Sequence, residues 1–164
     1  MRKLVLILAV MVILPVAVFA DLGVGAAAFY KSPILLGQDN DIDNLNVDQF
    51  SFGGDLRLKL GWFQGEALLL YSGGDVNSLN MYLDAGVALD MALVRLSLGA
   101  GPNFTYNFDE RSPAQVGLNA KVGVDVLLGR VSVGLSYIMA MNLDNGLYVN
   151  TGTGLLGAQV LFWM

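Results

Sequence analysis

The sequence contains no cysteine and no histidine among its 164 residues. Without cysteine, the chain forms no disulfide and offers no thiol nucleophile. Without histidine, it lacks Ser-His and Cys-His dyads, histidine proton shuttles and the donors of most zinc sites. We therefore predict no catalytic residues, no metal site and no cofactor, and we expect that the protein is not an enzyme.

Positive charge is also scarce. Nine basic residues stand against fourteen acidic ones, which gives a formal net charge of −5. Because nucleic-acid binding needs a basic surface, we expect no nucleic-acid partner. Charged residues make up only 14% of the chain and hydrophobic residues 55%, which is too apolar for an ordinary soluble domain.

The first twenty residues have the features of a secretory signal peptide. Arg2 and Lys3 form a positive start, residues 4–18 form an apolar core, and small residues occupy the −3 and −1 positions of a cleavage site after Ala20. An uncleaved membrane anchor is the alternative. Cleavage leaves one domain over residues 21–164, with seven basic and fourteen acidic residues and a net charge of −7.

Beyond residue 20 there is no run of about 18 apolar residues of the kind that forms a transmembrane helix. Instead, apolar residues alternate with polar ones. In the stretch GGDLRLKLGW, residues 53–62, Leu56 and Leu58 alternate with charged neighbours such as Arg57. A β-strand places such alternate side chains on opposite faces. The same pattern recurs in seven further segments, at 22–31, 63–71, 80–91, 94–106, 115–126, 130–139 and about 154–163.

The connections between these segments alternate in length. The long ones cover 32–48, 72–79, 107–114 and 140–153, and the short ones are the two-residue turns Gly61-Trp62, Ala92-Leu93 and Leu128-Gly129. Glycine favours such tight hairpins. The pattern predicts an all-β fold, an eight-stranded antiparallel up-and-down transmembrane β-barrel, whose closure satisfies every backbone group in lipid.

The polar faces decide which side of the barrel is inside. A soluble lipocalin-like barrel, the alternative, shows its polar face to water. Here the alternating charges are five acidic and five basic, which suits a packed polar lumen better than a soluble surface. We predict a lumen charge network, with Asp90 opposite Arg95, Arg57 opposite Glu66, and every charge paired. Its members are Asp55, Arg57, Lys59, Glu66, Asp84, Asp90, Arg95, Lys121, Asp125 and Arg130.

Aromatic residues lie near both ends of the predicted strands, as expected for two belts at the headgroup regions. The predicted belt residues are Tyr30, Phe52, Tyr71, Phe104, Tyr106 and Tyr137 near the long connections, and Trp62, Phe63, Phe162 and Trp163 near the short turns.

A second group of inward positions is apolar and lies near the long connections. It consists of Phe29, Leu68, Leu70, Ile138 and Leu155. Two interpretations stay open. These residues plug the barrel as a core, or they line an apolar pocket covered by Ile34, Leu35 and Leu36 that binds a small hydrophobic molecule and releases it into the membrane.

The first long connection is acidic, with Asp39, Asp41 and Asp43 spaced two apart. Asn44 and Phe50 stand where a calcium loop needs glycine and a bidentate glutamate, so we expect a solvated loop. Weak bridging of divalent cations by this loop stays an open alternative.

Strand number, loop asymmetry and the aromatic last strand GAQVLFWM resemble the small eight-stranded outer-membrane β-barrels, the group that includes OmpX and the membrane domain of OmpA. The resemblance implies a bacterial outer-membrane location, contact with lipid, and recognition of the last strand by the barrel-assembly machinery. Trp163 and Met164 follow Phe162, which departs from the usual terminal phenylalanine.

The sequence thus predicts a monomeric outer-membrane barrel with a structural or surface-interaction role, long acidic loops outside and a closed lumen. Extracellular ligands or host surfaces are its expected partners. The alternative is a binder or transporter of a small hydrophobic molecule.

Overall fold

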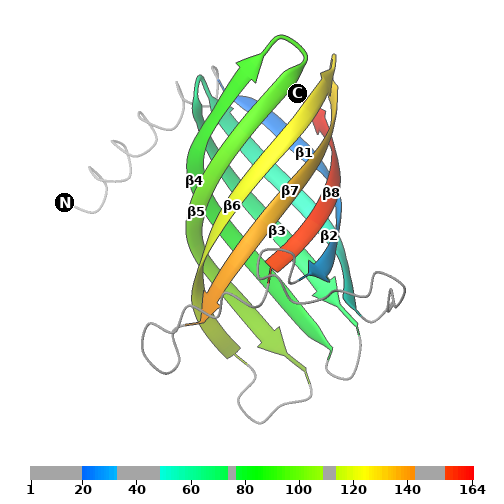
Figure 1. The fold of residues 1–164 in the computed structure, drawn as a ribbon, viewed down its shortest axis with the longest axis vertical. Coiled ribbons are helices and arrows are strands. Elements are labelled where there is room, and N and C mark those ends of the chain that lie inside the picture. The colour runs from blue at the N-terminus through cyan, green and yellow to red at the C-terminus, as the bar shows by residue number, and fades with distance from the viewer. Residues whose placement is uncertain (1–19, 33–48, 74–76, 109–113, 143–153) are drawn as a thin grey trace, which may run out of the picture.

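The computed structural model describes residues 20–32, 49–73, 77–108, 114–142 and 154–164. These residues form eight antiparallel strands arranged as a barrel (Figure 1). The strands are β1 (Asp21–Ser32), β2 (Phe50–Leu60), β3 (Phe63–Ser72), β4 (Ser78–Met91), β5 (Val94–Asn107), β6 (Ala114–Leu128), β7 (Val131–Asn142) and β8 (Gly154–Trp163). Within the described ranges, no helical segment has the length and apolarity of a transmembrane helix.

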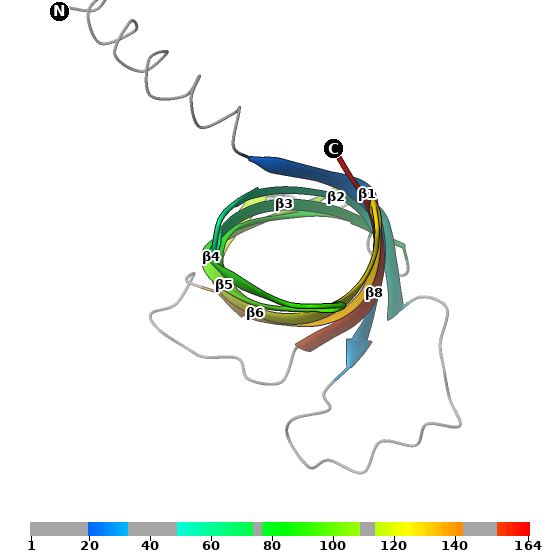
Figure 2. The ribbon, with the colours of Figure 1, turned by 90° about the horizontal axis from the view of Figure 1, so that it is seen from above.

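Each strand pairs with its neighbours in the chain, and β1 pairs with β8 to close the barrel. Seen along its axis, the sheet forms a continuous ring (Figure 2). The closing seam runs from Gly23 opposite Trp163 to Ser32 opposite Gly154. The predicted fold class is therefore confirmed, and the strands match the eight segments of alternating polarity.

Alternation along each strand separates two surfaces. Leu56 and Leu58 of β2 are exposed on the outside, whereas Asp55, Arg57 and Lys59 are buried inside. On the outer surface, Leu98 is 60% exposed, Leu135 57% and Val122 53%. So much exposed aliphatic surface on one barrel is what a lipid environment requires.

Three two-residue turns connect β2 to β3, β4 to β5 and β6 to β7, and we call this end of the barrel the short-turn end. Each turn begins with a residue of positive φ: Gly61 at 60°, Ala92 at 52° and Gly129 at 70°. Favoured hairpin turns need positive φ at this first position, which glycine adopts without strain. The third turn is therefore Gly129-Arg130, and the predicted turn Leu128-Gly129 was wrong by one residue.

Candidate functional site

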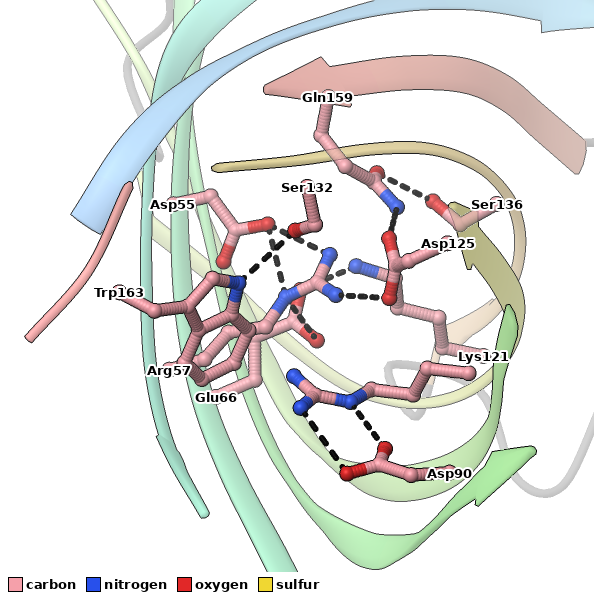
Figure 3. A network of polar contacts seen from close by, with 11 residues as sticks. Asp55, Arg57, Glu66, Asp90, Lys121, Asp125, Ser132, Ser136, Gln159 and Trp163 are labelled. Carbon is pink, nitrogen blue, oxygen red and sulfur yellow. Dashed lines mark hydrogen bonds and ion pairs between the residues drawn. The ribbon is translucent and has the colours of Figure 1, made fainter. Parts of the chain in front are cut away.

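Arg57 of β2 lies at the centre of the lumen and its side chain is 0% exposed (Figure 3). Its Nη2 is 2.8 Å from Oδ2 of Asp55, and its Nη1 is 3.0 Å from Oδ2 of Asp125. Its Nε lies 3.4 Å from Oε2 of Glu66. Strands β2, β3 and β6 thus direct three carboxylates at one guanidinium, whose rigid fork of N–H groups can donate to several acceptors at once.

Hydrogen bonds extend this arrangement across the barrel (Figure 3). The Nζ of Lys121 donates to Oε1 of Glu66. Gln159 donates from Nε2 to Oδ1 of Asp125 over 3.3 Å, and Ser136 donates from Oγ to Oε1 of Gln159 over 2.8 Å. The central network, as we call it, consists of Asp55, Arg57, Glu66, Lys121, Asp125, Ser136 and Gln159. Its mutual bonds satisfy most of these groups, which keeps the cost of burying charge low.

A second cluster lies nearer the short-turn end, where Asp90 binds two cations. Its Oδ1 accepts a hydrogen bond from Nε of Arg95 over 2.6 Å, and its Oδ2 lies 2.8 Å from Nζ of Lys59. We call Lys59, Asp90 and Arg95 the short-turn cluster. The side chain of Asp90 is 37% exposed, so water screens this cluster more than the central network.

Trp163 belongs to the lumen, and its predicted place in an aromatic belt was wrong. It is only 9% exposed, and its Nε1 donates a hydrogen bond to Oγ of Ser132 over 2.9 Å. The guanidinium carbon of Arg95 lies 4.2 Å from the centre of its ring, a cation–π contact. The ring covers Gly23 of β1, where an added Cβ would lie 3.0 Å from it. Alternation along β8 puts Phe162 outside and therefore Trp163 inside.

Arg130 was also misplaced by the sequence prediction. It is exposed in the turn between β6 and β7, because that turn is Gly129-Arg130. Asp125, expected near it, binds Arg57 instead. The lumen therefore holds nine of the ten predicted charges, five acidic and four basic.

Asp84 departs from the expectation that every inward charge is paired. Among the described residues, it has no cation within ion-pair distance, and its Oδ1 accepts a hydrogen bond from Nδ2 of Asn119. The residue is 7% exposed.

The apolar inward residues form one layer between the central network and the long connections. Phe29, Leu68, Leu70 and Ile138 are each 0% exposed, and Leu155 packs against them, partly buried. The apolar layer also includes Ala27, Tyr82 and Ala140. Every residue of the predicted pocket thus lies in a single cluster. The proposed cover, Ile34, Leu35 and Leu36, and the acidic residues Asp39, Asp41 and Asp43 lie outside the described residues.

A layer of uncharged polar side chains lies beyond the apolar layer, toward the long connections. Ser51 and Ser72 share a hydrogen bond of 2.6 Å, and Asn80 donates to Ser72 over 3.1 Å and to Ser78 over 3.2 Å. Thr105 donates to Asn80 over 2.8 Å. Hydroxyl and amide groups here satisfy one another.

The other predicted belt residues lie on the outer surface. Those exposed are Phe52, Tyr71, Phe104, Tyr106, Trp62, Phe63 and Phe162, and Tyr30 and Tyr137 are half-buried. Near the long connections, the ring centres of Tyr30 and Phe50 are 5.0 Å apart. The sequence prediction omitted Phe50, although it has the same outward parity as Phe52.

The predicted charge network did not include four uncharged lumen residues: Asn119 and Gln159, which bind Asp84 and Asp125, Ser136, which binds Gln159, and Ser132, which binds Trp163. All four have inward parity, which is the signal that identifies them. In the described ranges, no three His, Cys, Asp or Glu side chains gather in a geometry suited to a metal ion.

No protein-family model matches the sequence, and no curated protein sequence matches it. Similarity is found with solved structures. The N-terminal β-barrel domain of Pseudomonas aeruginosa OprF gives a TM-score of 0.66 at 14% identity, over 88% of this chain and 97% of that chain. Ail, the attachment invasion locus protein of Yersinia pestis, gives 0.57 at 13% identity, over 88% and 97%. The chain therefore has the fold of the small eight-stranded outer-membrane β-barrels.

Proposed function

We propose that this protein is a monomeric barrel of the bacterial outer membrane, exported with cleavage after Ala20. Its role is structural or in surface interaction, its lumen is closed to solutes, and its long acidic loops face outside. The observation that carries the proposal is the filled lumen. The central network and the apolar layer occupy successive levels, and Arg57, Phe29 and Leu70 in them are 0% exposed.

The outer surface supports the membrane location. Its exposed residues are largely aliphatic across the middle, and aromatic residues lie toward both ends. A soluble protein rarely exposes so large an apolar surface. In a membrane, lipid tails cover this apolar surface, and the closed sheet leaves no strand edge with unpaired backbone groups.

The buried apolar layer favours a plug over a hydrophobic-ligand pocket. Four of the five predicted pocket residues have no exposed surface, and they pack against Tyr82. A barrel of eight strands has an interior that side chains just fill. We therefore assign these residues to closing the barrel and not to binding or transporting a ligand.

A surface-interaction role belongs to the long connections. The first of them, residues 32–48, carries Asp39, Asp41, Asp43 and Asp48 and no basic residue. The name of the Yersinia pestis neighbour refers to attachment and invasion, which supports the general idea of an adhesive surface for this fold.

Cysteine labelling tests the membrane location directly, because the natural chain has no cysteine. We expect Val122→Cys in outer-membrane vesicles to react with a lipid-soluble maleimide, and the matched variant Lys121→Cys to resist it. Val122 is 53% exposed and Lys121 3%. Reaction at 121 but not at 122 would show that the inward and outward faces are assigned the wrong way round, because a shift of one residue moves every side chain to the opposite face. Recovery of the folded protein in a soluble fraction would refute the location.

Conductance tests the closed lumen. Folded protein in a planar lipid bilayer should give no steady current, because both levels of the lumen are filled. A large, stable conductance would contradict the proposed closure, while leaving the membrane location intact.

A further inference from the structure

A small cavity lies in the lumen beside strands β3, β4, β5 and β6. The space that the centre of a water molecule can occupy in it is about 10 Å³, which is room for one water molecule. The polar side chains that line it come from Gln64, Glu66, Asp84, Ser97 and Lys121. We call it the Asp84 cavity, and its size limits the occupant to a molecule as small as water.

Two glycines create this space. Gly86 of β4 and Gly99 of β5 lie directly opposite each other, and both line the cavity. Both have inward parity, so a side chain at either position would project into the lumen. A Cβ added to Gly99 would already lie 3.3 Å from Cβ of Asp84. The cavity therefore exists because two adjacent strands lack inward side chains at the same level.

Two oxygen atoms of the lining have no hydrogen-bond donor among the described residues. They are Oδ2 of Asp84 and Oε1 of Gln64. Asp84 is 7% exposed and Gln64 8%, and both of these oxygens are fully buried. A buried acceptor without a donor costs free energy, and a molecule that donates to both oxygens would remove that cost.

The same lining holds groups that can donate. The ammonium of Lys121 has three N–H groups, and it donates one hydrogen bond to Oε1 of Glu66. The hydroxyl of Ser97 is a donor as well as an acceptor. Asp84 forms no ion pair within the described part of the chain, and its Oδ1 accepts from Asn119. The occupant must therefore donate two hydrogen bonds and be able to accept one from a neighbouring N–H or O–H.

Water meets these requirements. It has two O–H donors and two lone pairs, and a buried water typically makes about three hydrogen bonds. It is neutral, so it fits beside both the carboxylate of Asp84 and the ammonium of Lys121. A metal ion donates no hydrogen bond, and the ammonium repels it. We propose that the Asp84 cavity binds one ordered water molecule, which donates to Oδ2 of Asp84 and to Oε1 of Gln64.

Such a water joins Asp84 to the central network. It connects β4 to Gln64 of β3, and it lies beside Lys121 of β6, whose ammonium is already bound to Glu66. The carboxylate that lacks a direct cation then interacts with Lys121 across one water molecule, and a bridge of this kind is nearly as favourable in enthalpy as a direct hydrogen bond. The water is thus a structural part of a lumen that stays closed to larger solutes.

A high-resolution crystal structure of the folded full barrel tests the site directly. We expect one peak of solvent density in the cavity, about 2.5–3.0 Å from both Oδ2 of Asp84 and Oε1 of Gln64. No density at that position would overturn the proposal, and it would assign the cavity to a dry space or to a proton on Asp84.

Oxygen-17 relaxation dispersion of water provides a second test, because it counts the water molecules held inside the folded barrel in detergent. Gly99→Ala adds a methyl group to the cavity wall and should lower the dispersion amplitude by the contribution of one water. Gly54→Ala is the matched control and should keep the wild-type amplitude, because Gly54 is exposed on the outer surface of β2.

Gln64→Leu removes one of the two acceptors and should have the same effect as Gly99→Ala. It keeps the test decisive if Gly99→Ala fails to migrate as a folded barrel. Amplitudes that stay at the wild-type value in the folded cavity variants would overturn the proposal, since the counted waters would then lie elsewhere.

Discussion

Removal of Arg57 should destabilise the barrel far more than removal of Lys59, although both project inward from β2 two residues apart. Arg57→Met leaves three buried carboxylates without their shared cation. Breaking one buried ion pair by deleting a partner costs about 3–5 kcal/mol. We expect the upper part of this range, since Asp55 and Asp125 keep no other cation within ion-pair distance among the described residues.

Lys59→Met is the matched control. Lys59 binds Asp90, which is 37% exposed and still keeps Arg95 after the change. Partly exposed pairs contribute about 0–1 kcal/mol, so this variant should unfold close to the wild type. The difference between the two variants should correspond to more than about a hundredfold in the folded-to-unfolded ratio.

The assay is urea unfolding of protein refolded into phosphatidylcholine vesicles, with the folded fraction read from gel mobility without boiling. Adding Asp125→Leu to Arg57→Met should recover part of the loss, because it removes one unpaired carboxylate. Equal midpoints for Arg57→Met and Lys59→Met would refute the reasoning, since they would show that the central network is no more desolvated than the short-turn cluster.

Two further predictions concern packing on either side of the wall. Gly157→Ala should destabilise the barrel by about 1–3 kcal/mol in the same assay, because its Cβ would lie 2.3 Å from the ring of Phe29. Gly54→Ala is the control and should leave stability unchanged, because its Cβ would meet only a carbonyl oxygen at 3.8 Å. Equal losses of stability in the two variants would contradict the tight packing of the apolar layer. In single-tryptophan variants, brominated lipid should quench the fluorescence of Trp62, which is 68% exposed, and leave that of Trp163, which is 9% exposed, nearly unchanged. Strong quenching of Trp163 fluorescence would show that its side chain lies on the outer surface.

The strands were predictable because lipid on one side and a polar lumen on the other impose a period of two on every segment. Leu56 and Arg57 show this directly, since neighbours in sequence face opposite environments. The pairings of Asp90 with Arg95 and of Arg57 with Glu66 followed from turn length alone, because a two-residue hairpin fixes the register.

The errors have equally specific causes. The turn at Gly129 was shifted by one residue because positive φ at its first position was not considered, and Arg130 was then placed inside. Trp163 was assigned by residue type, against the parity of its strand. The partner of each charge depends on side-chain length across the lumen, as when Arg57 reaches from β2 to Asp125 of β6, and no local pattern encodes that contact.

Closure of the barrel has a kinetic consequence. Strands β1 and β8 form the seam, so Gly23 must find Trp163 across 140 residues of chain. Contacts of such sequence separation cost loop-closure entropy before they give any stabilisation, and they slow folding. The seam therefore forms only after β8 has been delivered, and until then the edges of β1 and of the growing sheet remain open to pairing with other chains. The unclosed sheet is therefore the stage of folding at which this chain is most exposed to aggregation.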